Sequence, residues 1–107
     1  MMTEKKIATF EEFYPFYLHQ HSHFWNRVTH FIGTSIFLFL AILAIVKTDI
    51  LIFFIGIFSA YFFAWIGHFF IEKNKPATFK YPWMSLKGDF KLYFEICTGK
   101  QKFNVKK

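Results

Sequence analysis

Two long stretches without a charged residue, residues 28–46 and 50–71, constrain this chain more than any other feature. At 1.5 Å per residue, helices over these stretches would be about 28 Å and about 33 Å long, close to the hydrocarbon thickness of a bilayer. Only the polar tripeptide Lys47-Thr48-Asp49 separates them. The sequence therefore predicts two transmembrane helices joined by a tight turn.

The composition favours a membrane protein over a soluble domain. Hydrophobic residues make up 54% of the 107 residues and charged residues only 19%. A soluble bundle that buries both helices is the alternative, but the rest of this short chain is too small to cover them. A net charge of +6 would usually suggest nucleic acid as a partner. Here we expect anionic lipid headgroups instead, and no nucleic acid.

The basic residues predict the orientation of the hairpin. All but one of the 13 Lys and Arg residues precede the first apolar stretch or follow the second, and only Lys47 lies in the turn. Basic residues are enriched in cytoplasmic loops. We therefore expect an integral membrane protein with both termini in the cytoplasm, in the inner membrane if the source is bacterial.

The flanking segments are rich in aromatic residues. Residues 7–20 carry them at helical spacing, and residues 79–98 interleave them with Lys80, Lys87 and Lys91. Such amphipathic segments are typical of the headgroup level of a membrane. Pro82 and the dipeptide Gly88-Asp89 predict that the second flank is broken into short pieces.

The predicted fold class is therefore all-α, an integral membrane helical hairpin flanked by interfacial helices. We expect one membrane domain over residues 1–107. It would comprise an interfacial segment at about residues 7–22, spans at residues 24–47 and 50–72, and a second interfacial segment at residues 79–98.

Five histidines gather at one end of the predicted hairpin. The start of the first helix and the end of the second meet at the same membrane face, so the histidines can converge there. Ionisable residues inside membrane spans are costly and point to a functional site. The five are His19, His21, His23, His30 and His68.

Helical spacing adds polar partners to these histidines. Asn26 and His30 are four residues apart and share one helix face, and so do His68 and Glu72. An imidazole and a carboxylate at this spacing can bind one metal ion. We therefore predict a metal site. The structural alternative is that these groups form hydrogen bonds between helices, with the first three histidines as a solvated tract.

The ligand types leave the metal open. Imidazoles suit zinc, copper, iron and nickel alike, and several histidines with one carboxylate suit Fe(II) that keeps open positions for O2 and substrate. A zinc site would use similar ligands. A heme b held between His30 and His68 is a third option.

Two stretches of the sequence resemble one known family. Residues 16–23 read FYLHQHSH and lead into Asn26 and His30, and residues 65–78 read WIGHFFIEKNKPAT. The pattern H-x4-N-x3-H with a later G-H-x3-E-K-x-K-P-A is similar to the family named for metabolism of phytosphingosine to odd-numbered fatty acids. Residues 81–90 resemble its short bacterial branch, and the resemblance covers about residues 10–95.

This resemblance implies an activity for the protein and roles for its motif residues. The fungal member is an Fe(II)-dependent dioxygenase of the endoplasmic-reticulum membrane that oxidatively decarboxylates 2-hydroxy fatty acids. His21, His30 and His68 would be iron ligands and His23 a further one. Glu72 would be a ligand or would orient His68, and Asn26 and Glu72 are the predicted catalytic residues. Gly67 and Pro76 complete the motif. A continuous helix would turn His21 away from His30, so we expect a turn near His23.

We therefore expect a membrane dioxygenase whose substrates are a 2-hydroxy fatty acid and O2. Its cofactor would be Fe(II), and its partner would be membrane lipid. The fungal relative is longer and has more spans, so a homodimer is a candidate assembly. The alternatives are a non-catalytic lipid-binding or scaffolding hairpin and a bis-His heme protein.

Overall fold

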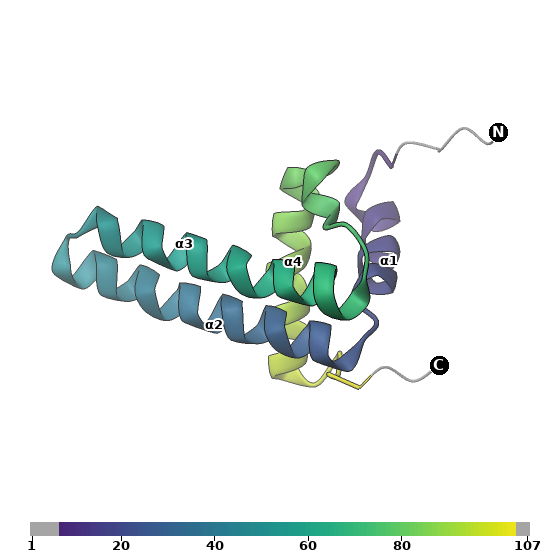
Figure 1. Cartoon of the computed structure of the whole chain (residues 1–107). Helices are drawn as coiled ribbons and strands as arrows, with labels where there is room; N and C mark the ends of the chain where they lie inside the picture. The colour runs from purple at the N-terminus through teal and green to yellow at the C-terminus, as the bar shows by residue number, and fades with distance from the viewer. Residues whose placement is uncertain (1–6, 105–107) are drawn as a thin grey trace.

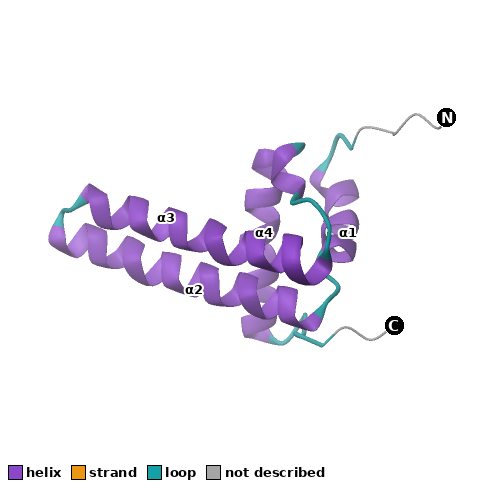
Figure 2. Cartoon of the chain, in the orientation of Figure 1, coloured by secondary structure: helices purple, strands orange, loops and turns teal. Residues whose placement is uncertain are grey.

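The structure is a computed structural model that describes residues 7–104, and within these residues it is helical with no strand (Figure 2). The predicted all-α fold is confirmed. Lys5, Lys6, Lys106 and Lys107, which the orientation argument uses, lie outside the described residues. The helices are α1 (Phe10–Gln20), α2 (Phe24–Lys47), α3 (Ile50–Trp65), the π-helical η1 (Ile66–Glu72), the 3-10 turn η2 (Ala77–Phe79) and α4 (Pro82–Thr98).

Helix α2 pairs with α3 and η1 to form the long hairpin (Figure 1). The two arms, Phe24–Lys47 and Ile50–Glu72, are long and apolar enough to cross a membrane, each with a mean hydropathy of 2.2 over its most apolar 18 residues. Only 11% of each of these windows is buried in the protein. Ile45, Phe58 and Phe70 are each about three-quarters exposed. Apolar surface on this scale is unfavourable in water.

The turn of the hairpin follows from its polar residues. Thr48 adopts a left-handed conformation with φ 46° and ends α2. Asp49 then caps α3, since its side chain accepts a hydrogen bond from the Leu51 backbone N–H at 3.0 Å. Below the turn, the rings of Phe37 and Phe53 pack with centroids 5.8 Å apart.

Helices α1 and α4 gather at the other end of the hairpin, where both ends of the described chain also lie (Figure 1). The Thr9 side chain caps helix α1 by accepting from the Glu12 backbone N–H, and the Glu12 side chain accepts from the backbone N–H of Ala8. The buried core of the described chain lies here, between α1, η2 and α4. It consists of Phe13, Tyr14, Tyr17, Ala77, Tyr81 and Leu92.

Helix α4 begins at Pro82, after the separate turn η2, so the break predicted there is confirmed. The helix then runs without interruption through Gly88-Asp89, so the break predicted at this dipeptide is wrong. The physical reason is packing against α1. A Cβ at Gly88 would lie 2.9 Å from the ring of Tyr17, so only glycine allows the two helices to approach this closely. Asp89 in turn accepts a hydrogen bond from the Tyr17 hydroxyl. Both residues join α4 to α1 instead of ending the helix.

Candidate metal centre

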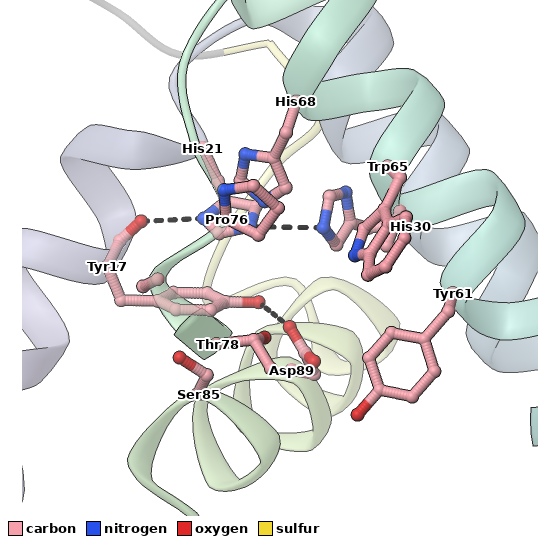
Figure 3. A pocket seen from close by; sticks show the side chains of 12 residues that line it. Tyr17, His21, His30, Tyr61, Trp65, His68, Pro76, Thr78, Ser85 and Asp89 are labelled. Carbon is pink, nitrogen blue, oxygen red and sulfur yellow. Dashed lines mark hydrogen bonds between the residues drawn. The ribbon is translucent and has the colours of Figure 1, made fainter. Parts of the chain in front are cut away.

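Three buried histidines from three different segments meet at the base of the hairpin (Figure 3). His21 directly follows the last residue of α1, His30 lies in the second turn of α2, and His68 lies in η1. Their exposed fractions are 1%, 8% and 2%. Each offers one ring nitrogen, and these nitrogens lie within 4.8 Å of one another. Among the described residues, this group has the composition and spacing to hold a metal ion.

The second ring nitrogen of each histidine faces a carbonyl oxygen. Nδ1 of His21 lies 2.8 Å from the Tyr17 carbonyl oxygen, and Nδ1 of His30 lies 2.9 Å from that of Asn26. Nδ1 of His68 lies 2.7 Å from Oδ1 of Asn74. A carbonyl oxygen only accepts hydrogen bonds, so each Nδ1 carries the proton. Each Nε2 is then left with a lone pair, which is the form that binds a metal.

The rings of His21 and His30 bring two ring nitrogens together, which is unfavourable unless a proton or a metal ion lies at one of them. Their Nε2 atoms are 3.1 Å apart, and with both protons on Nδ1 neither nitrogen can donate to the other. Burial lowers the pKa of His21 well below its usual value, and the nearby His30 and His68 lower it further. His21 is therefore neutral at physiological pH. A metal ion bound by both Nε2 atoms would remove the repulsion between their lone pairs without protonating a buried ring.

A turn between α1 and α2 places His21 against His30. Helix α1 ends at Gln20, the His21 backbone N–H donates to the Leu18 carbonyl, and α2 begins after His23. Arg27, which is 3% exposed, donates from Nε to the His21 carbonyl oxygen at 2.6 Å. Its Nη1 also donates to the Lys102 carbonyl oxygen, which ties the C-terminal segment to this turn. Arg27 thus holds this turn in place, a role that its basic charge alone did not predict.

His23 and Glu72 lie next to the three-histidine group but outside it. His23 is exposed and caps α2, with its Nδ1 accepting from the Trp25 backbone N–H at 3.1 Å. Glu72 accepts from the Ser22 hydroxyl, the His23 backbone N–H and the Asn26 side-chain amide, at 3.0 to 3.1 Å. The start of a helix favours negative charge. Glu72 therefore fastens η1 to the start of α2.

Asn26 is fully buried and joins two parts of the site. Its Nδ2 donates to Glu72, while its backbone carbonyl holds Nδ1 of His30. Its Oδ1 has no hydrogen-bond partner among the described residues. This oxygen lies against Gly67, where a Cβ would be 2.0 Å from it and 2.5 Å from the Thr29 hydroxyl. Only glycine fits at position 67, which explains why it precedes His68.

Three residues of the site were not assigned a role from the sequence. Asn74 orients His68 and also donates from Nδ2 to the Gln20 carbonyl at 3.1 Å. The Tyr17 ring stacks on His21 with centroids 4.0 Å apart, and its hydroxyl donates to Asp89. An Asn shortly after the H-x3-E pair and an acid within an aromatic stretch were the available signals for Asn74 and Asp89.

Asp89 is an unusual acid for this position. Burial raises its pKa to about 7, and the hydrogen bond from the Tyr17 hydroxyl lowers it by less. Burial and the nearby Asp89 also raise the pKa of Tyr17, so this hydroxyl keeps its proton and acts as a donor. Asp89 borders a small cavity of about 10 Å³ beside the three histidines, which Tyr61, Trp65 and Pro76 also line.

The fold and the site define an all-helical protein with two apolar arms and a buried trio of histidines at their base. A family profile described as 2-hydroxy-palmitic acid dioxygenase Mpo1-like matches residues 7–101, which include all three histidines. The chain therefore belongs to the Mpo1-like family, and the family predicted from the sequence is confirmed. Comparison with the curated proteins and with the solved structures found no match.

Proposed function

We propose that this protein is an Fe(II)-dependent membrane dioxygenase that converts a 2-hydroxy fatty acid into the fatty acid one carbon shorter. The observation that carries the proposal is that Nδ1 of His21, His30 and His68 each lies 2.7 to 2.9 Å from a carbonyl oxygen, which leaves three unprotonated Nε2 atoms for one site. The description of the family supplies the reaction, since it names a 2-hydroxy-palmitic acid dioxygenase.

The spacing of the nitrogens supports a shared metal ion. Two nitrogens about 2.1 Å from one ion are about 3.0 Å apart at right angles and about 3.4 Å apart at tetrahedral angles. The Nε2 atoms of His21 and His30 are 3.1 Å apart. Both ideal separations lie close to the observed one, so the choice of iron rests on the family description, which names a dioxygenase. The adjoining cavity of about 10 Å³ accommodates a water or an ion, which favours an ion over heme b.

The overall reaction balances without an external electron donor. A 2-hydroxy acid and O2 give the shortened acid, CO2 and water: RCH(OH)COOH + O2 → RCOOH + CO2 + H2O. The organic substrate loses four electrons and O2 gains four. Iron held by the three histidines would supply the redox chemistry that brings O2 and substrate together.

The residues around the histidines bind and orient the substrate. The Tyr17 hydroxyl donates a hydrogen bond to Oδ1 of Asp89. Oδ2 is then left to accept a hydrogen bond from the 2-hydroxyl of the fatty acid. A carboxylate with a raised pKa is also suited to take up that proton. The carbonyl oxygens that hold Nδ1 of His21 and His30 fix both rings. Asn26 and Glu72 act one step further away, by holding the start of α2 against η1.

We also propose that the hairpin spans the membrane with the histidines at the cytoplasmic face. The exposed apolar surface of α2 and α3 supports the span. Lys73, Lys75 and Lys87, all exposed, lie on the segments at the base of the hairpin, which supports the orientation. A fatty acid could then reach the site from the lipid. One chain supplies all three histidines, so the site needs no second copy, and the homodimer stays a prediction.

A non-catalytic hairpin, in which the histidines are only hydrogen-bonded to one another, is the rival function. The facing Nε2 atoms of His21 and His30 weigh against it, because a neutral pair cannot form that hydrogen bond. A dioxygenase would contain a bound metal ion, and a non-catalytic hairpin would not.

The test is the metal content and activity of protein purified anaerobically in detergent. We expect one iron per chain, no heme absorption band, and release of CO2 from 2-hydroxyhexadecanoic acid. His30→Ala should lose both iron and activity. The matched control is His19→Ala, because His19 is exposed and lies outside the site. Protein that binds no iron, or that binds it equally in His30→Ala, would rule out the proposal.

A further inference from the structure

We infer that the groove between α2, α3 and α4 binds the alkyl chain of the 2-hydroxy acid. The inference rests on the proposed function for the head group of the substrate, and it adds the path of the chain. The groove has a volume of about 280 Å³. Its walls are formed mainly by apolar side chains, among them Phe37, Ile57, Leu86 and Phe90. Binding sites of this kind, with few polar groups at one place, suit an amphiphile.

The groove is continuous with the metal centre. His30, Tyr61, Ala64 and Asp89 line both the groove and the small cavity beside the three histidines. His30 and Asp89 thus form a polar end, and the apolar walls lead away from it. A ligand with its carboxylate and 2-hydroxyl at this end would place its alkyl chain in the groove without bending back.

The lining residues of α2 give the direction and length of the groove. His30, Thr34 and Phe37 follow one another along one face of the helix. From His30 to Phe37 the helix rises about 10 Å, which is the length of about eight extended methylene groups. Phe53 and Phe90 pack on Phe37 at the far end, with ring centroids 5.8 and 6.1 Å from it. The remaining carbons of a longer chain would lie along the exposed apolar arms.

Small residues of α3 keep the groove open. Ala60 and Ala64 both line it. A larger side chain at position 60 would fill the space about one helical turn beyond His30. The neighbouring Ser59 provides a matched control, because it does not line this groove but lines the adjacent surface groove together with Phe58 and Phe62. The same increase in size at these two adjacent positions should therefore have different effects.

The experiment is photo-crosslinking of a 2-hydroxyhexadecanoic acid that carries a diazirine at carbon 9. The full-length, iron-loaded protein is labelled in detergent without O2, so that no turnover occurs. The labelled residues are then identified by mass spectrometry. We expect labels on Phe37, Phe53 or Phe90. Ala60→Leu should reduce this labelling by about tenfold, and Ser59→Leu should leave it unchanged.

A second variant guards against misfolding of Ala60→Leu. Thr34→Leu narrows the groove from the opposite wall and should reduce the labelling as well, with both variants retaining iron. Labels on Phe58 and Phe62, insensitive to Ala60→Leu and Thr34→Leu, would overturn the inference. A separate CO2-release assay tests the proposed function. Activity with labels outside the groove overturns the inference alone, while labels in the groove of an inactive protein support it and overturn the proposed reaction.

Discussion

Nδ1 of His68 lies 2.7 Å from Oδ1 of Asn74, and the same amide donates from Nδ2 to the Gln20 carbonyl oxygen. This second hydrogen bond fixes which way the amide points. The proton of His68 must therefore lie on Nδ1, and Nε2 is free to bind a metal. Asn74 thus decides the tautomer of a ligand while also joining the segment after η1 to the end of α1.

Removing the acceptor at position 74 should weaken the metal site. We expect Asn74→Leu to reduce iron affinity by about 10- to 100-fold, the usual effect of losing a partner that orients a ligand. Asn74→Asp keeps an oxygen for Nδ1 and should retain iron. Titration with a chelator, followed by metal analysis, measures both. Equal affinity in all three proteins would show that Asn74 does not orient His68.

Glu72→Gln separates a ligand from a residue that fastens two helices. Glu72 accepts three hydrogen bonds at the start of α2, and glutamine keeps an oxygen there but removes the charge. We expect the free energy of unfolding in detergent to fall by about 1–2 kcal/mol, since hydrogen bonds to charged groups are worth about 1.5–3 kcal/mol each. The iron content should stay at one per chain. Loss of iron without loss of stability would identify Glu72 as a ligand.

Gly67→Ala should disturb the contact between η1 and α2. The added Cβ would lie 2.0 Å from Oδ1 of Asn26, and neither group is at the end of a long flexible side chain. Overpacking of this kind costs about 1–3 kcal/mol. Combining it with Asn26→Ala makes room, so the two losses should add to less than their sum. Thermal unfolding of the two single variants and the double variant measures this coupling, and strict additivity would contradict it.

Iron release on acidification should distinguish the buried site from an exposed histidine tract. The pKa of His21 is well below the usual value of about 6.5, so protons compete for its Nε2 only at lower pH. We expect iron to be retained at pH 6.5 and released well below it. Metal analysis after equilibration between pH 8 and pH 4 gives the midpoint. Release centred near the usual histidine value of about 6.5 would show that buried His21 does not hold the iron.

Asp89 should make the protein less stable as the pH rises. Its pKa is about 7 in the folded protein and near 3.8 when unfolded, so its contribution is complete below pH 4 and is lost as the pH approaches 7. Each pH unit in that window corresponds to at most about 1.4 kcal/mol. Asp89→Asn removes this loss. Unfolding of both proteins at pH 5 and pH 8 isolates the effect, because both carry the same histidines. A variant that gains nothing at pH 8 relative to pH 5 would show that Asp89 is not held neutral.

Much of the architecture could be predicted because its causes are local. The uncharged runs and the turn residues Thr48 and Asp49 determine the hairpin, since length, apolarity and capping act within a few residues of the chain. The break predicted at Gly88-Asp89 was wrong for a related reason. Local rules treat glycine as a helix breaker, whereas here the ring of Tyr17, far away in the sequence, occupies the space that a side chain would need.

The sequence by itself determined the two apolar arms, the family, and the end of the hairpin at which the histidines lie. Only the tertiary structure decided which histidines meet. His21, His30 and His68 come together because the turn after Gln20 and the wide turn of η1 direct rings from three segments into one buried space. His23 and Glu72 are only a few residues away in sequence, yet they bind the start of α2 instead. Spacing along a helix specifies a shared face, but hydrogen bonds between segments determine where each ring nitrogen points.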